Sequence, residues 1–508
     1  MRAVVVLCIA VTACIAERGP MNNRMAHSPT SYLARASRQP VNWQPWGRDA
    51  FALAARLERP ILLYIGSDSC RWCAETDRAI YTDPEIGALV NALFVPIRVD
   101  RDERPDVAQR YQTAVERLAG LHGWPLTVFL TADGSAFFGG TYFPADDPVT
   151  GRGLKQLLPE IAKSYRDRRS FIVQKAALVR QLVITSTNES RGVLRPALIR
   201  QGLDALTREL TAAAEAHAVT GSVLHVQAAS LLLTEYARFR DTSALALARR
   251  TLDLMLDSSS AAAAEDPSRL VQAGLVGALA KAWVLTGDTR YREAGRRGAR
   301  ALSRELPDVA LFADQDALIV EDLLLTAATV GEPNVETHAR AALDALLQRA
   351  YARGWGVRHV IGFASGGGSA GTTPTGFLQD QVAVASACLA AHQVTGDARY
   401  LELARDLAGI VERDYADSLG GYYDTAELWA PAAGGLTDRT KQPEANAAAA
   451  LFFARLATVT GDAAYRQRAQ ATLDAFAGNA TGAGVRAATF LSAARETLAP
   501  LPPPVSRP

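Results

Sequence analysis

The sequence predicts two different folds in one chain, an α/β domain followed by an all-α domain. Short apolar runs suited to buried strands occur mainly before residue 150, and they alternate there with helical segments. From Leu154 onward the pattern becomes an alanine- and leucine-rich helical periodicity with few strand signals. A chain of 508 residues is also too long for one ordinary hydrophobic core.

The charge balance and the length of the apolar runs argue against nucleic-acid binding and against a membrane span. The chain has 54 basic and 53 acidic residues, a net charge of +1, and therefore no electrostatic footprint for nucleic acid. No segment approaches the roughly 20 apolar residues that a membrane span requires. A hydrophobic content of 49% and a charged content of 21% are typical of a folded globular protein.

Residues 1–20 have the pattern of an export leader. Arg2 precedes an uncharged run that ends before Glu17, the basic-apolar-small order of a signal segment. Residues 11–14 resemble a bacterial lipobox, which would make Cys14 a lipidated residue and the protein periplasmic or anchored by lipid. The alternative is that translation starts at Met21, and the protein would then be cytoplasmic.

Residues 21–150 show the element order of a thioredoxin-like fold. A helix, a strand, a helix that carries two cysteines, a second strand, a further helix and a third strand with a hairpin follow one another. Asp83 and Pro84 have the sequence of a helix start. The expected helices span residues 44–59, 84–93 and 105–118, and the expected strands span residues 61–65, 94–99, 126–130 and 136–138.

A Cys-x-x-Cys pair lies at the centre of this domain. Residues 66–69 end the first strand with turn formers, so Cys70 falls where a helix begins and Cys73 lies on the same face. A helix N-terminus favours a thiolate, and Arg71 adds a cation. We expect Cys70 to attack a partner disulfide and Cys73 to resolve the mixed disulfide. Two structural thiols and half of a zinc site are the alternatives.

Several motifs, which follow one another along the chain, resemble those of the thioredoxin-like domain of the spermatogenesis-associated protein 20 family, also called the YyaL-like family. The resemblance covers about residues 23–145. It implies a thioredoxin-like domain followed by an α/α-barrel of the six-hairpin glycosidase type. The motifs are Asn23-Arg24, His27-Ser28-Pro29, Pro40-Val41-Asn42-Trp43, Pro45-Trp46, Cys70-Arg71-Trp72-Cys73, residues 99–106, residues 123–130 and residues 139–144.

The same resemblance implies a cis proline at Pro125, beside the cysteines, so that Trp124 and Pro125 shape a docking surface for the substrate. The family has histidines where this chain has Arg71 and Ala74, which weakens a metal site here. Trp72 belongs to the motif. His122, a nearby loop histidine, would tune the pKa of a cysteine thiolate or shuttle a proton. The alternative is that His122 is exposed to solvent and has no role at the site.

The remainder of the chain is expected to form a helical bridge with a linker at residues 151–192, a barrel at residues 193–498 and a disordered tail at residues 499–508. A Thr-Gly-Asp repeat supports the barrel, because each copy would end one helix with glycine and begin the next with an acidic cap. At about 50 residues per helix pair, the length allows about six hairpins. The copies begin at Thr286, Thr395 and Thr460, with a weaker one at Val330.

A catalytic barrel would need paired carboxylates or histidines across a cavity. The candidates are Asp380, Asp424 and Glu444, near predicted helix starts or mouth loops, and the further acids Asp314 and Asp316. A capping or solvated role is the simpler interpretation of each.

The sequence thus predicts a thiol–disulfide oxidoreductase that acts on protein thiols or disulfides, with a barrel that recognises a partner or a carbohydrate. No cofactor beyond the Cys70–Cys73 disulfide and no metal is expected. A carbohydrate-active barrel, glycosidase- or epimerase-like, with a regulatory or vestigial redox domain is one alternative. A non-enzymatic binding protein is the other.

Overall fold

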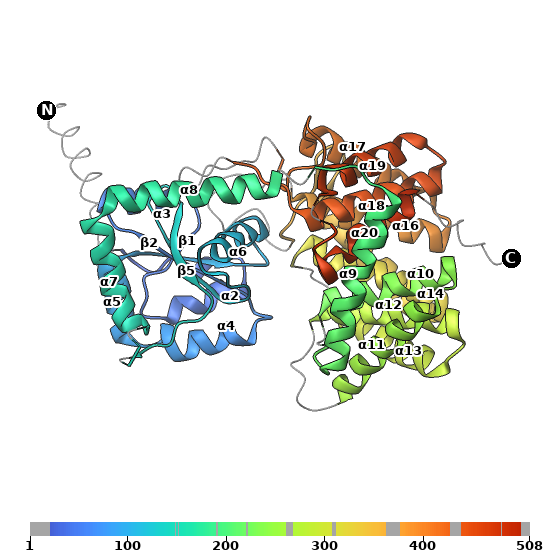
Figure 1. Ribbon diagram of the computed structural model, residues 1–508, viewed down its shortest axis with the longest axis horizontal. Helices are drawn as coiled ribbons and strands as arrows, with labels where there is room; N and C mark the ends of the chain where they lie inside the picture. Colours follow the sequence, from blue (N-terminus) through green and yellow to red (C-terminus); the bar gives the residue numbers. More distant parts are fainter. Residues whose placement is uncertain are drawn as a thin grey trace, which may run out of the picture. The chain divides into compact units, whose positions relative to one another are not determined.

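The computed structural model describes residues 21–498 apart from 148, 151, 189–190, 220–221, 261–267, 307–310, 362–375, 427–437 and 479. The predicted leader with Cys14 and the predicted tail at residues 499–508 lie outside the described residues. The chain divides into two compact units near Val183 (Figure 1). Across the described residues, no helix combines the length and the apolar character that crossing a membrane demands.

The first unit is built on a five-stranded mixed sheet in the order β1-β3-β2-β4-β5. β2 pairs in parallel with β3 and antiparallel with β4, so it is the central strand. The strands are β1 (Gln44–Pro45), β2 (Ile61–Gly66), β3 (Val95–Asp100), β4 (Leu126–Leu130) and β5 (Ala136–Gly140).

Helices cover both faces of this sheet, so every residue of β2 is buried. Alternate residues of β2 pack against α3 and α6 on one face and against α2, α5 and α7 on the other. The helices are α2 (Ser31–Arg35), α3 (Arg48–Leu57), α4 (Arg71–Thr76), α5 (Pro84–Leu93), α6 (Pro105–Ala119), α7 (Leu154–Asp167) and α8 (Arg169–Asn188).

Two expectations for this unit need correction. Gln44 and Pro45 do not begin the first long helix; they form an edge strand on β3, and the helix starts at Arg48. Helix α7 packs on α5 and buries Leu154 and Leu158 in the core, so the domain continues past residue 150. Amphipathic periodicity shows that a helix buries one face, but it does not identify the surface that covers it.

The second unit is an α/α-toroid. α10, α12, α14, α16, α18 and α20 form an inner ring in which each helix packs on the next and α20 returns to α10. The helices that alternate with them lie outside. The bounds are α9 (Pro196–Glu215), α10 (Val223–Phe239), α11 (Thr242–Ser260), α12 (Arg269–Thr286), α13 (Thr289–Arg304), α14 (Ala313–Val330), α15 (Pro333–Ala350), α16 (Leu378–Thr395), α17 (Ala398–Ile410), α18 (Pro443–Thr460), α19 (Ala463–Phe476) and α20 (Ala488–Leu498).

The Thr-Gly-Asp repeat has the predicted structural role. Gly287, Gly396 and Gly461 end inner helices in the left-handed conformation that glycine adopts without strain. In each copy the aspartate that follows caps the next outer helix by accepting a backbone N–H. One short motif therefore closes three of the helical hairpins, and the predicted fold class is confirmed.

Candidate functional site

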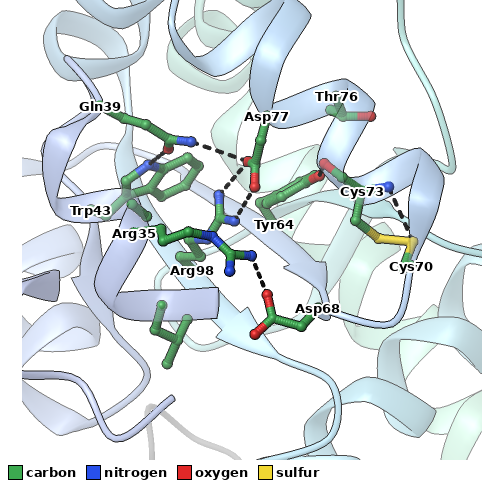
Figure 2. A network of polar contacts seen from close by, with 12 residues as sticks. Arg35, Gln39, Trp43, Tyr64, Asp68, Cys70, Cys73, Thr76, Asp77 and Arg98 are labelled. Atoms are coloured by element: carbon green, nitrogen blue, oxygen red, sulfur yellow. Dashed lines mark hydrogen bonds and ion pairs between the residues drawn. A yellow bond between two sulfur atoms is a disulfide. The ribbon is translucent and has the colours of Figure 1, made fainter. Parts of the chain in front are cut away.

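The two cysteines lie where β2 passes into α4. Cys70 is the N-cap residue of α4, and its sulfur accepts a hydrogen bond from the backbone N–H of Cys73 at 3.1 Å. The two sulfurs are joined as a disulfide (Figure 2). Cys70 is partly exposed, whereas Cys73 is completely buried. A partner can therefore approach Cys70 but not Cys73.

The surface beside the disulfide is aromatic and basic. Trp72, between the two cysteines, is 60% exposed, and Arg71 is exposed beside it. Trp124 lies partly buried with the Arg101 guanidinium 5.2 Å from its ring centre. The Trp124–Pro125 peptide bond is cis, as the family resemblance implies.

His122 forms a local hydrogen bond. It is exposed on the loop after α6, and its Nδ1 lies 2.6 Å from Glu116 Oε1, six residues earlier. Among the hydrogen bonds and ion pairs of the described residues, that of His122 is with Glu116 and none joins it to Cys70 or Cys73. A role of His122 as a proton shuttle therefore stays a prediction.

A buried ion pair lies behind the disulfide, and the sequence analysis missed it. Arg98 of β3 is 1% exposed and donates two hydrogen bonds to the Asp77 carboxylate, at 2.7 and 2.6 Å (Figure 2). Asp77 follows directly after α4. The ring centres of Tyr32, Tyr64 and Trp43 lie 4.1, 5.1 and 5.6 Å from the guanidinium carbon.

This network ties the cysteine helix to the sheet. The Tyr64 hydroxyl donates to the Cys73 carbonyl oxygen at 3.4 Å, so a second strand residue holds the same helix. The signal in the sequence was Arg98 itself, a charge in the otherwise apolar run at residues 94–99. Such a charge must be paired when the strand is buried.

Asp100, at the end of β3, is a second buried acid in this region. It pairs in register with Gly66, the last residue of β2. Burial raises the pKa of Asp100 to about 6, and the neighbouring Asp102 carboxylate adds to the effect, while a hydrogen bond from Thr30 opposes it. The carboxyl group is therefore protonated more readily than an exposed aspartate.

The barrel candidates lie at the N-terminal ends of inner helices. Asp380, in the first turn of α16, is fully buried, and it accepts hydrogen bonds from the backbone N–H groups of Phe377 and Asp314, at 2.7 and 3.2 Å. Its Oδ1 also lies 2.8 Å from Nδ1 of His359. Asp380 thus holds the starts of α14 and α16 and the His359 loop together.

The other two candidate acids, Asp424 and Glu444, have different surroundings from Asp380. Asp424 accepts hydrogen bonds from the backbone N–H and the hydroxyl of Thr440, at 3.2 and 2.6 Å, and so joins two parts of the connection between α17 and α18. Glu444 is exposed in the first turn of α18. Asp316 is buried in α14, and burial raises its pKa to about 6.

One cluster among the described residues has the composition and spacing of a metal site: Asp314, His359 and Asp380. Nδ1 of His359 lies 3.7 Å from Asp314 Oδ1 as well as near Asp380. The hydrogen bonds of Asp380 give Asp380 and His359 a structural explanation without an ion. The cysteines, joined to each other, present no thiolate to a metal.

Comparison with known proteins identifies the first unit. Residues 22–183 match a family model named for a DsbH-like thioredoxin domain and described as a protein of unknown function, DUF255. Human spermatogenesis-associated protein 20 is 35% identical over 170 residues, and an uncharacterized protein of Caenorhabditis elegans, B0495.5, is 34% identical over 165. The N-terminal part of this chain is a thioredoxin-like domain similar to the corresponding region of these proteins.

The matched region covers 34% of this chain and 22% of the human protein, so the likeness concerns the first unit. The family match ends at the residue where the chain divides into its two units, which agrees with the packing of α7 on the sheet.

Two solved structures with helical folds are distantly similar to this chain. An unsaturated glucuronyl hydrolase specific for heparin is 14% identical with a TM-score of 0.48, covering 60% of this chain and 97% of that one. A D-mannose isomerase is 12% identical with a TM-score of 0.42, covering 55% and 88%. The assignment of the toroid rests on the ring of helix contacts in this chain.

Proposed function

We propose that the first unit is a thiol–disulfide oxidoreductase in which Cys70 attacks and Cys73 resolves. The observation that carries the proposal is the position of the disulfide, with a partly exposed Cys70 at the N-cap of α4 and a buried Cys73 one turn later. A partner thiolate or disulfide would reach Cys70 first. The buried sulfur would then release the partner by attacking Cys70.

The electrostatics of Cys70 support this assignment. Its sulfur already accepts a backbone N–H at 3.1 Å in the disulfide, and the same donor would stabilise the Cys70 thiolate after reduction. A more stable thiolate is a better leaving group, which favours reaction at Cys70 Sγ. No metal or organic cofactor is needed for this exchange.

Protein thiols or disulfides fit the surface around Cys70. Trp72 presents a large apolar side chain to solvent, and Trp124 lies half-buried next to a cis proline. An extended peptide could pack its side chains on these rings while its cysteine reaches the sulfur. Aromatic side chains are common anchors in protein interfaces.

The barrel is better suited to recognition than to glycoside chemistry. Asp380 is completely buried and its oxygens accept hydrogen bonds, so it cannot reach a glycosidic oxygen. Asp424 is held by Thr440 in a similar way. We therefore infer that these acids fix the loops at the barrel mouth, where a protein partner or a carbohydrate would bind.

Trapping of a mixed disulfide tests the assignment of the two cysteines. In the full chain, Cys73→Ser should accumulate a stable mixed disulfide with a cysteine-containing peptide disulfide, because the resolving sulfur is missing. Cys70→Ser should accumulate much less, since Cys73 is inaccessible.

Cys388→Ser is the matched control. Cys388 is a buried free thiol in α16, and burial raises its pKa to about 12, so its removal should change nothing. Equal trapping by the Cys70 and Cys73 variants, or none by either, would contradict the proposal.

A further inference from the structure

Tyr32 is a buried tyrosine whose hydroxyl is unaccounted for. It lies in the short helix α2, is 1% exposed, and its oxygen has no hydrogen-bond partner among the described residues. Burying an unpaired hydroxyl costs about 1–3 kcal/mol. A buried hydroxyl without a partner therefore calls for an explanation.

The hydroxyl lies at the same end of β2 as the sulfur of the resolving cysteine. A Cβ atom placed on Gly66 would lie 2.9 Å from the Cys73 sulfur and would overlap the Tyr32 hydroxyl oxygen. The sulfur and the oxygen therefore approach the same point at the end of β2. Glycine at position 66 is what allows both atoms to come this close to the strand.

Arg98 and the N-cap of α2 hold the ring of Tyr32 in this position. The Arg98 guanidinium carbon lies 4.1 Å from the ring centre, and Arg98 is itself fixed by its two hydrogen bonds to Asp77. Thr30 caps α2 by accepting the backbone N–H of Leu33 at 3.3 Å. Because both the ring and its helix are anchored, the hydroxyl is held at the point near Gly66 that the Cys73 sulfur also approaches, before any reaction begins.

We propose that Tyr32 is a positioning residue that donates a hydrogen bond to the Cys73 thiolate whenever the disulfide is open. This inference rests on the proposed thiol–disulfide exchange. It identifies the group that makes Cys73, the buried cysteine of the pair, reactive. A buried thiolate is otherwise disfavoured, because burial raises the pKa of a thiol. Burial also raises the pKa of Tyr32, so the hydroxyl keeps its proton and acts as a donor.

The step balances without another reactant. The Cys70 thiolate attacks a partner disulfide, forms a new S–S bond and releases one partner thiolate. Cys73 then loses its thiol proton to water, and its thiolate attacks Cys70 Sγ. The internal disulfide forms, the mixed disulfide breaks, and the second partner sulfur leaves with the electron pair. Tyr32 donates to the Cys73 sulfur throughout the open state, and most strongly between proton loss and attack, when that sulfur is a thiolate.

Tyr32→Phe in the full chain tests the inference, because it keeps the ring over Arg98 and removes only the hydroxyl. Equilibration with glutathione buffers should show the variant favouring the disulfide by about tenfold, which is about 30 mV for a two-electron couple. In a Cys70→Ser background, thiolate absorbance should show the Cys73 pKa raised by about one unit. Tyr111→Phe is the control, since that buried hydroxyl donates to the Gly134 carbonyl on the other face of the sheet.

The inference is overturned if Tyr32→Phe leaves the Cys73 pKa unchanged in the Cys70→Ser background. That measurement needs no exchange activity, so it separates this inference from the proposed function, which fails instead if the unmodified protein shows no reversible couple. If the phenylalanine variant does not fold, 3,5-difluorotyrosine at position 32 replaces it. A more acidic hydroxyl should lower the Cys73 pKa, and an unchanged or higher value contradicts the inference.

Discussion

Replacing Asp77 with asparagine would leave the Arg98 guanidinium buried without its counter-charge. The pair is joined by two hydrogen bonds of 2.7 and 2.6 Å, and Arg98 is almost inaccessible to water. Breaking a buried ion pair by removing one partner costs about 3–5 kcal/mol. Asp77 keeps 20% side-chain exposure and the aromatic rings still face the cation, so we expect about 3 kcal/mol.

Hydrogen exchange of the β2 and β3 amides in the full chain measures this loss, because it reports on the first unit separately from the barrel. Asp167→Asn is a matched control, since Asp167 forms an exposed ion pair with Lys163 on α7 and its loss should be undetectable. The double variant Asp77→Asn, Arg98→Met should be more stable than Asp77→Asn alone, because no unpaired charge remains. Equal exchange in Asp77→Asn and Asp167→Asn would refute the reasoning.

Three other substitutions have definite expected outcomes. Asp100→Asn should stabilise the first unit by about 2 kcal/mol at pH 7. Because the pKa of Asp100 is raised in the folded state, the stability of the unmodified protein is fully present below about pH 4 and declines through about pH 6. Hydrogen exchange of β3 followed against pH should show that the variant lacks this decline. Gly66→Ala should cost about 1–3 kcal/mol by the same assay, because the new methyl group meets the Cys73 sulfur at 2.9 Å, and unchanged exchange would contradict the close approach. Asp380→Ala should cost about 3 kcal/mol in α14 and α16 only, because two backbone N–H groups lose their acceptor, whereas the exposed Glu444→Ala should leave those helices unaffected.

Local sequence patterns were sufficient for the elements that carry the site. The apolar run at residues 61–65, the turn after it and the position of Cys70 at a helix start all reflect preferences of neighbouring residues, and the structure confirms each of them. The same is true of the glycine and aspartate that close the barrel hairpins. Short-range rules work here because propensity and capping act within a single turn.

The rest depends on contacts between segments far apart in the chain. Tyr32, Gly66 and Cys73 meet only because α2 packs against the end of β2, and no spacing in the sequence encodes that contact. The pair of Asp380 with His359 likewise joins two different loops of the barrel. A buried charge such as Arg98 shows that a partner must exist, but the fold alone identifies it as Asp77.

The reduction potential of the Cys70–Cys73 pair in the full chain tests the central claim most directly. Equilibration with defined ratios of reduced and oxidised glutathione, followed by thiol labelling, should show a reversible two-electron couple within the range from about −270 to −120 mV that thiol–disulfide oxidoreductases span. The couple should disappear in Cys70→Ser and persist in Cys388→Ser. A disulfide that does not exchange with glutathione at any ratio would contradict the account.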